Sequence, residues 1–224
     1  VGVLWPAIDP QAWPVEPTSE EQHAWTKFEL KPTKSYLITI GRACFMKGGF
    51  EALTVAQASS MPLVHVGGGE TEAMKKKATE LSVELIVMPR INDLELVALV
   101  RHAHALIAVA RTEGFGLTPM EAVMVNTPAL VVDEAGFTHT ITDGWNGRRL
   151  PWPTDEDSIQ QWVEAIEQAG LEANREQWSK AGRERILERF SSNHQAEGLA
   201  RGLATLVVQV ELTDLVLLPG LFPA

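Results

Sequence analysis

The amino-acid sequence predicts an α/β fold built on a doubly wound parallel sheet, and three observations support this fold class. Short aliphatic runs recur along the middle of the chain and lack strict alternation, as strands buried on both faces do. Helical patterns fill the intervals between them, which is the spacing of βαβ units. The composition, 45% hydrophobic and 21% charged over 224 residues, is that of a globular protein with one generous domain or two small ones.

Strands and helices are expected to alternate through the middle of the chain. The expected strands are Tyr36–Ile40, Leu63–Val66, Glu84–Val87, Ala105–Val109 and Ala129–Asp133. The helices expected between them are Gly49–Ala58, Glu70–Leu81, Asp93–His102 and Thr118–Val125. Ligands of such sheets bind beyond the carboxyl ends of the strands, so functional residues are expected in the loops that follow them.

The two ends of the chain differ from this middle. Residues 1–34 are rich in proline and tryptophan and are expected to form an entry or linker segment with one helix, Ser19–Phe28. The main domain is expected over residues 35–202. Closing helices are expected at Asp155–Ala169, Asn174–Phe190 and His194–Val208. Residues 203–224 form an apolar tail, which either packs on the protein or offers a surface to a partner domain or a membrane.

Charge and cysteine content exclude several classes of function. Lys and Arg number 19 against 29 Asp and Glu, and the net charge of -10 disfavours non-specific binding to nucleic acid or anionic lipid. An anionic ligand would therefore need a local basic pocket. The single cysteine, Cys44, excludes an intrachain disulfide and a Cys-rich zinc site, and no apolar run reaches the roughly 18 residues of a membrane span. We therefore expect a cytoplasmic protein.

The loop after the first expected strand is basic and rich in glycine. It contains Gly41-Arg42 and then Lys47-Gly48-Gly49 before a helix. Such a turn offers backbone N–H groups and a positive helix end to a phosphate, and Arg42 and Lys47 add two cations. Because the lysine precedes the glycine pair, this is not the GxxxxGK[ST] loop of nucleotide triphosphatases. A basic surface turn without a ligand is the alternative interpretation.

A second glycine run follows the next expected strand. Gly67, Gly68 and Gly69 stand between that strand and the following helix. Such a run either lets a ligand approach the backbone or permits a backbone conformation that other residues avoid.

The strongest signal lies after the fourth expected strand. Thr118 before Pro119 predicts a helix N-cap, and Glu121 three residues after Thr118 predicts a capping box. That interpretation leaves Glu113-Gly114-Phe115-Gly116 unexplained, a carboxylate and two glycines in front of a helix N-terminus. The amides of a helix end bind oxygens and a carboxylate accepts from hydroxyls. The segment therefore suits a ligand with both phosphates and sugar hydroxyls.

These motifs together resemble those of the family 4 retaining glycosyltransferases of the GT-B fold. Glu113 and Glu121 match the two glutamates of the Glu-x7-Glu signature. Further matches follow in order over about residues 1–202: Ile8-Asp9-Pro10, Trp13-Pro14, Gly41-Arg42, Lys47-Gly48, Val66-Gly67-Gly68-Gly69 and Asp143-Gly144-Trp145-Asn146-Gly147. The resemblance implies one Rossmann-like GT-B half with closing C-terminal helices, whose residues 35–202 bind a nucleotide sugar.

The resemblance implies a role for each matched residue. Glu113 would bind hydroxyls of the donor sugar, and Glu121 the ribose hydroxyls. Arg42 and Lys47 would neutralise the diphosphate leaving group as the anomeric C–O bond breaks, so Glu113, Arg42 and Lys47 are the catalytic candidates. No metal or cofactor is expected beside the donor itself, a UDP-, GDP- or ADP-sugar. Further donor contacts are expected from Gly41, Gly68, Arg90, Ile91, Gly114, Phe115, Gly116, Leu117 and Thr118.

The resemblance also implies a missing partner. Members of this family react in a cleft between two Rossmann-like halves, and the acceptor half precedes the donor half. An acceptor-binding domain or subunit is therefore the expected partner, and the chain alone is expected to bind donor without transferring sugar. Membrane association of the full enzyme stays open. The alternative is a non-catalytic nucleotide-sugar-binding or regulatory module, whereas a related GT-B epimerase is disfavoured by the Glu113 to Glu121 pattern.

The chain departs from the family pattern near the proposed sugar site. Ala110-Arg111 stands where a small Pro-Ser pair is usual, and Asn126 stands where glycine commonly precedes the Thr-Pro pair. His139 stands where a glutamate is frequent. These departures leave the phosphate-binding residues in place but leave the base and the sugar unspecified. The sequence does not name the acceptor either.

Overall fold

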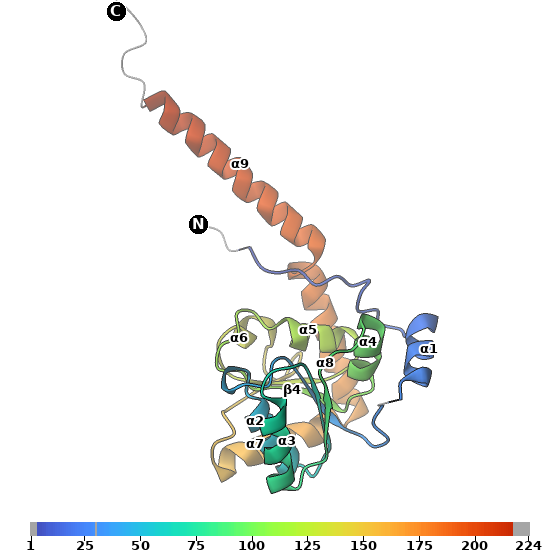
Figure 1. The fold of residues 1–224 in the computed structure, drawn as a ribbon. Helices are drawn as coiled ribbons and strands as arrows, with labels where there is room; N and C mark the ends of the chain where they lie inside the picture. Colours follow the sequence, from blue (N-terminus) through green and yellow to red (C-terminus); the bar gives the residue numbers. More distant parts are fainter. Residues whose placement is uncertain (1–3, 30, 217–224) are drawn as a thin grey trace, which may run out of the picture.

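A computed structural model describes residues 4–29 and 31–216 of the chain. Its centre is a six-stranded sheet of order β3-β2-β1-β4-β5-β6, in which every neighbouring pair is parallel (Figure 1). The strands are β1 (Leu37–Ile40), β2 (Leu63–Val66), β3 (Leu85–Met88), β4 (Ala105–Ala108), β5 (Ala129–Val132) and β6 (Arg148–Leu150). The predicted doubly wound sheet is confirmed.

The strands carry apolar residues on both faces because helices cover both faces of the sheet. Ile38, Val64 and Leu106 are fully buried in neighbouring strands, where removal of apolar surface from water is worth roughly 25 cal/mol per Å². The sequence did not predict β6, because two of its three residues are Arg148 and Arg149. This edge strand pairs only with β5 among the described strands, so its arginines reach solvent and nearby carboxylates.

The helices form two layers, one on each face of the sheet. On one face lie α2 (Gly49–Ala58), α3 (Thr71–Leu81) and α7 (Glu156–Ala169), and on the other α4 (Asp93–Arg101), α5 (Leu117–Met124) and α8 (Glu172–Arg189) (Figure 1). Two short helical turns, η1 (Phe45–Lys47) and α6 (Phe137–Thr140), were not predicted because they are too short to show a helical period.

The order of the strands reverses between β1 and β4. These two strands are neighbours in the sheet, although β2 and β3 separate them along the chain. The helix after β1, α2, packs on one face and the helix after β4, α5, packs on the other. The two loops therefore diverge at the carboxyl edge of the sheet, and ligands of doubly wound folds bind at this point.

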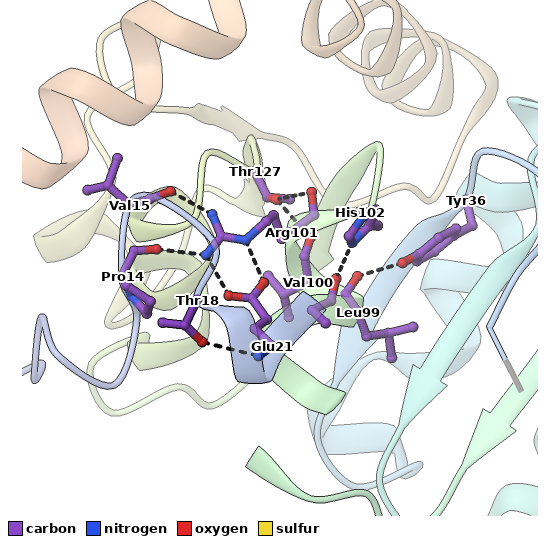
Figure 2. A network of polar contacts seen from close by, with 11 residues as sticks. Pro14, Val15, Thr18, Glu21, Tyr36, Leu99, Val100, Arg101, His102 and Thr127 are labelled. Carbon is purple, nitrogen blue, oxygen red and sulfur yellow. Dashed lines mark hydrogen bonds and ion pairs between the residues drawn. The ribbon is translucent and has the colours of Figure 1, made fainter. Parts of the chain in front are cut away.

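Helix α1 (Ser19–Lys27) is attached to α4 by a buried ion pair (Figure 2). The guanidinium of Arg101 donates to both carboxylate oxygens of Glu21, at 2.6 and 3.0 Å. It also donates to the backbone carbonyls of Pro14 and Val15. The entry segment is thereby fixed to the main domain at the amino-terminal side of β4.

The C-terminal helix α9 (Ser192–Val216) extends away from the body (Figure 1). It begins where the N-terminal segment meets the end of α8, since the amide of Ile8 donates to the carbonyl of Phe190 at 2.9 Å. The prediction of a helix over His194–Val208 was too short. The predicted apolar tail, 203–224, lies outside the described residues from residue 217 onward. No helix within the described ranges is both long and apolar enough to cross a membrane.

Candidate functional site

The loops after β1 and β4 bring together residues predicted to bind phosphate and sugar. Lys47 Nζ donates to Glu113 Oε2 at 2.9 Å. This ion pair spans the strand-order reversal, because Lys47 ends η1 on the β1–α2 loop and Glu113 lies on the β4–α5 loop. An ammonium group has three N–H donors, so Lys47 can also donate to an oxygen of a bound ligand.

Arg42 lies on the same loop as Lys47. The amide of Gly41 donates to the Val66 carbonyl at 2.9 Å, and the amide of Ala43 donates to the Gly68 carbonyl at 2.7 Å. The backbone is thus held on both sides of Arg42, while its side chain is exposed. The β1–α2 loop therefore presents two cations at the carboxyl edge of the sheet.

The carboxylate of Glu113 accepts hydrogen bonds from two of the backbone amides that were predicted to bind the donor. Its Oε1 accepts from the amides of Gly116 at 3.2 Å and Phe115 at 3.4 Å. Burial opposes its ionisation, but the hydrogen bond and charge of Lys47, with both amides, outweigh burial, and the pKa of Glu113 lies below its usual value. The amides of Leu117 and Thr118, in the first turn of α5, stay available to an anion.

The predicted capping box at Thr118 is wrong. Helix α5 begins at Leu117, and its N-cap is Gly116 in the left-handed conformation with φ 93°. Glycine adopts this φ without the penalty of a side chain, so the chain enters the helix before Thr118. A Cβ at residue 116 would also lie 2.9 Å from the ring of Phe137. Glu121 therefore has no capping role.

Glu121 is a half-buried carboxyl on the second turn of α5. Burial raises its pKa from 4.5 to about 7. Among the described residues the Glu121 carboxyl makes no hydrogen bond or ion pair, and a carboxylate that is partly removed from water is destabilised unless it is paired. Hydroxyl groups of a ligand would stabilise the ionised form by donating to it, which is the chemistry expected for a ribose.

Backbone packing explains most of the second glycine run. A Cβ on Gly67 would lie 1.9 Å from the carbonyl oxygen of Gly41. Gly69 forms an isolated β-bridge with Ala43. Gly68 has open space at its Cα, so of the three it is the one that can approach a ligand.

The remaining predicted donor residues lie around this centre. Arg90 and Ile91 follow β3, at the same edge but two strands from β1. Gly114 is exposed, and Phe115 is buried with its ring 5.3 Å from that of Trp5 and 5.1 Å from that of Phe190. Sequence reasoning missed Trp5, whose only signal was its place in a tryptophan-rich entry segment.

In the part of the chain that the structure describes, no cluster of three or more His, Cys, Asp or Glu side chains is placed to hold a metal ion. The histidines at 102 and 104 have separate partners. His102 stacks on Trp25 with ring centroids 4.0 Å apart, and His104 Nε2 lies 2.8 Å from the carbonyl of Ile166.

Comparison with models of protein families shows which family this chain belongs to. The model of the family described as "Glycosyl transferases group 1" matches residues 21–185, which include both sides of the site. The chain belongs to this family. It is a glycosyltransferase group 1 domain with the Rossmann-like fold of the GT-B enzymes.

Curated members of the group 1 family resemble this chain over part of their length. The O-antigen chain mannosyltransferase RfbU of Salmonella typhimurium is 30% identical over 146 residues, which cover 62% of this chain and 40% of that protein. The alpha-1,3/1,6-mannosyltransferase alg-2 of Neurospora crassa is 27% identical over 124 residues, 54% of this chain and 26% of that protein. The chain thus spans well under half the length of these two relatives.

Solved structures agree with the glycosyltransferase fold. Sucrose-phosphate synthase from Thermosynechococcus elongatus matches with a TM-score of 0.74 and 18% identity, over 92% of this chain and 52% of that one. Anabaena HepE in complex with UDP and glucose matches with a TM-score of 0.74 and 14% identity, over 91% of this chain and 57% of that one. The C-terminal domain of a group 1 family protein from Francisella tularensis matches with a TM-score of 0.65 and 18% identity, over 83% of this chain and 99% of that domain.

Proposed function

We propose that this chain is the donor-binding half of a family 4, retaining glycosyltransferase that transfers a hexose from a nucleoside diphosphate sugar to an acceptor. The observation that carries the proposal is the Lys47–Glu113 pair across the strand-order reversal. It places a cation suited to diphosphate beside a carboxylate suited to sugar hydroxyls. Arg42 and the high-pKa carboxyl of Glu121 complete a site for a ligand with phosphate, hexose and ribose.

The chemistry follows from where charge develops. Breaking the bond between the anomeric carbon and the phosphate oxygen leaves negative charge on the departing diphosphate. Arg42 and Lys47, with the free amides of Leu117 and Thr118, would stabilise that charge, since preorganised donors need no reorganisation as the bond breaks. Glu113 would orient the sugar through its hydroxyls, and Glu121 would hold the ribose. No metal ion is required in this scheme.

The relatives suggest which donors to test first. Those from Neurospora and Salmonella are named as mannosyltransferases, and the HepE structure contains UDP and glucose. GDP-mannose and UDP-glucose are therefore the first donors, followed by ADP-glucose. Calorimetric binding of this panel identifies the nucleotide.

Transfer itself requires an acceptor held near the anomeric carbon, and such positioning supplies several kcal/mol of the barrier. The match to an isolated C-terminal domain from Francisella tularensis shows that the fold of this chain also occurs as one separate domain of a group 1 family protein. We propose that a separate domain holds the acceptor. We therefore expect sugar transfer only when the chain is combined with such a domain. NMR of the product would report its anomeric configuration, and inversion would contradict the retaining assignment.

The competing function is a non-catalytic module that binds nucleotide sugars and regulates another protein. Both functions predict donor binding, so the transfer assay separates them. Turnover with a matching acceptor domain excludes the module. Turnover by the chain alone, near the roughly 1–1000 per second of ordinary enzymes, would show that no partner half is needed.

A further inference from the structure

Arg111 holds the turn that carries Lys47. Its Nη1 donates to the Phe45 carbonyl at 2.7 Å, and its own amide donates to the Met46 carbonyl at 2.9 Å. Its Nη2 forms an ion pair with Glu51 on α2. One residue therefore attaches both residues that precede Lys47 to the body of the domain.

Two aromatic rings enclose the same guanidinium. The Arg111 Cζ lies 3.8 Å from the ring centroid of Phe45 and 4.6 Å from that of Trp152, which follows β6. The indole of Trp152 in turn donates to Glu134. Stacking of this kind orients the planar guanidinium over the rings. It also explains a ring that is otherwise out of place, because Phe45 is 63% exposed.

We propose that Arg111 is a positioning residue, which clamps the Phe45–Lys47 turn so that Lys47 stands beside Glu113 before a donor binds. Sites whose charged groups are fixed in advance lose less free energy to ordering when the ligand arrives. The effect on the donor rests on the function proposed above.

The first test is the affinity for UDP and GDP, measured by calorimetry. We expect Arg111→Ala to weaken binding by roughly tenfold, about 1.4 kcal/mol. The matched control is Arg149→Ala, because Arg149 also pairs with one carboxylate and is 29% exposed against 27% for Arg111. We expect the control to bind as the wild type does, and equal losses in both variants would overturn the proposal.

Glu51→Gln separates positioning from simple loss of positive charge. This change keeps the Arg111 cation but replaces its charged acceptor on α2 with a neutral amide oxygen, which weakens the contact, and it makes the site more positive. A clamp predicts weaker nucleotide binding, whereas an electrostatic effect predicts tighter binding. In a Lys47→Ala background, the effect of Arg111→Ala should shrink below about twofold, because a residue that acts through Lys47 has nothing left to position. Additive losses would contradict this role.

Hydrogen exchange tests the clamp without any ligand. The amide of Lys47 donates to the Cys44 carbonyl at 3.1 Å, so it is protected while η1 is formed. We expect Arg111→Ala to speed its exchange at least several-fold, and Arg149→Ala to leave it unchanged. If the wild type binds no nucleotide, the proposed function fails while this measurement still decides the clamp. Unchanged exchange in Arg111→Ala would overturn it.

Discussion

Two ion pairs lie at opposite ends of the strands, and they differ in exposure and in how many of their hydrogen-bonding groups have partners. At the amino-terminal side of β4, Arg101 and Glu21 are 12% and 2% exposed, and the guanidinium also serves two backbone carbonyls. At the carboxyl edge, Lys47 and Glu113 are 39% and 21% exposed, and the ammonium makes one of its three possible hydrogen bonds within the described residues.

The difference indicates that the buried Arg101–Glu21 pair contributes to stability and that the more exposed Lys47–Glu113 pair is suited to ligand binding. Burial removes water from Glu21 and Arg101, so each depends on the other. The guanidinium uses four of its five N–H donors within the described residues, which leaves little capacity for a ligand. Lys47 and Glu113 keep solvent contact, so a phosphate or hydroxyl can join the pair without leaving a charge buried alone. A comparison of the two pairs by mutation therefore tests which end of the domain is built for function.

The largest effect is expected on stability at the buried pair. Arg101→Met should lower the free energy of unfolding by about 3–5 kcal/mol, because it leaves Glu21 buried without a partner. Lys47→Met should change it by less than about 1 kcal/mol, as removal of exposed pairs does. Chemical denaturation measures both, with the exposed Lys34–Glu84 pair as a control through Lys34→Met. Similar losses at Arg101 and Lys47 would remove the distinction.

For nucleotide affinity, the larger effect is expected at the carboxyl ends of the strands, where Lys47 and Arg42 lie. Lys47→Ala or Arg42→Ala should weaken binding of UDP or GDP by about tenfold or more, since a charge-assisted contact to phosphate contributes roughly 1.5–3 kcal/mol. Calorimetry on the folded variants provides the dissociation constants, and Lys34→Ala serves as a charge-matched control. An unchanged constant in both variants would exclude this loop as the phosphate site.

The two glutamates of the site should differ in their effects. Glu121→Ala is expected to weaken free nucleotide and nucleotide sugar alike, by roughly three- to tenfold, because both ligands carry the ribose. Glu113→Ala should weaken the binding of the nucleotide sugar only. Removal of Glu113 frees Lys47 and the amides of Phe115 and Gly116 for phosphate, which offsets the loss of the carboxylate that orients Lys47, so the affinity for free nucleotide should be spared. Equal losses for both ligands in Glu113→Ala would contradict the assignment.

A smaller effect is expected from pH. The carboxyl of Glu121 has a pKa of about 7, and its ionised form is the better acceptor for ribose hydroxyls. Affinity for a nucleotide sugar should therefore rise several-fold between about pH 6 and pH 8, in proportion to the ionised fraction, because proton release and ligand binding are thermodynamically linked. The Glu121→Gln variant should show no such rise. A flat profile in the wild type would remove Glu121 from the ribose site.

The smallest expected effect is on the stability of the ligand-free protein. Its sign is opposite to that of the effect on affinity, because stability falls as the pH rises. Because burial raises the pKa of Glu121 above its value of 4.5, its favourable contribution to stability is present below that pH and is lost as pH rises through about 7. Glu121→Gln should therefore gain stability relative to the wild type at about pH 8 but not at about pH 4.5. Thermal melts at both values measure the difference, and a gain of equal size at both would assign it to packing.

Local patterns predicted the sheet but not its polar edge. The apolar runs that became β1 to β5 were placed to within a residue, because burial on both faces demands such sequences. The strand β6 was missed because its arginines look like loop residues until β5 is beside them. The helix start at Thr118 was misplaced for a related reason, since the left-handed φ of Gly116 depends on a turn that no short motif reveals.

The types of residue at the site were predictable, but most of their pairings were not. A basic glycine loop and two glutamates eight residues apart indicated phosphates and hydroxyls from the sequence. The Lys47–Glu113 contact joins positions 66 residues apart, and only the adjacency of β1 and β4 creates it. The contacts of Arg111 with Phe45 and of Trp5 with Phe115 stayed hidden because these residues too are brought close only by folding.

The sequence by itself determined the α/β class, the loops that carry chemistry and the family resemblance, because strand burial and loop composition are local properties. The tertiary structure alone decided that the two loops meet where the strand order reverses, and that Glu121 is left without a capping role. It also decided that Arg101 pairs with a buried carboxylate and that Arg111 contacts the Phe45–Lys47 turn. Charge pairing and desolvation depend on distances between segments remote in the chain, and those distances exist only in the folded protein.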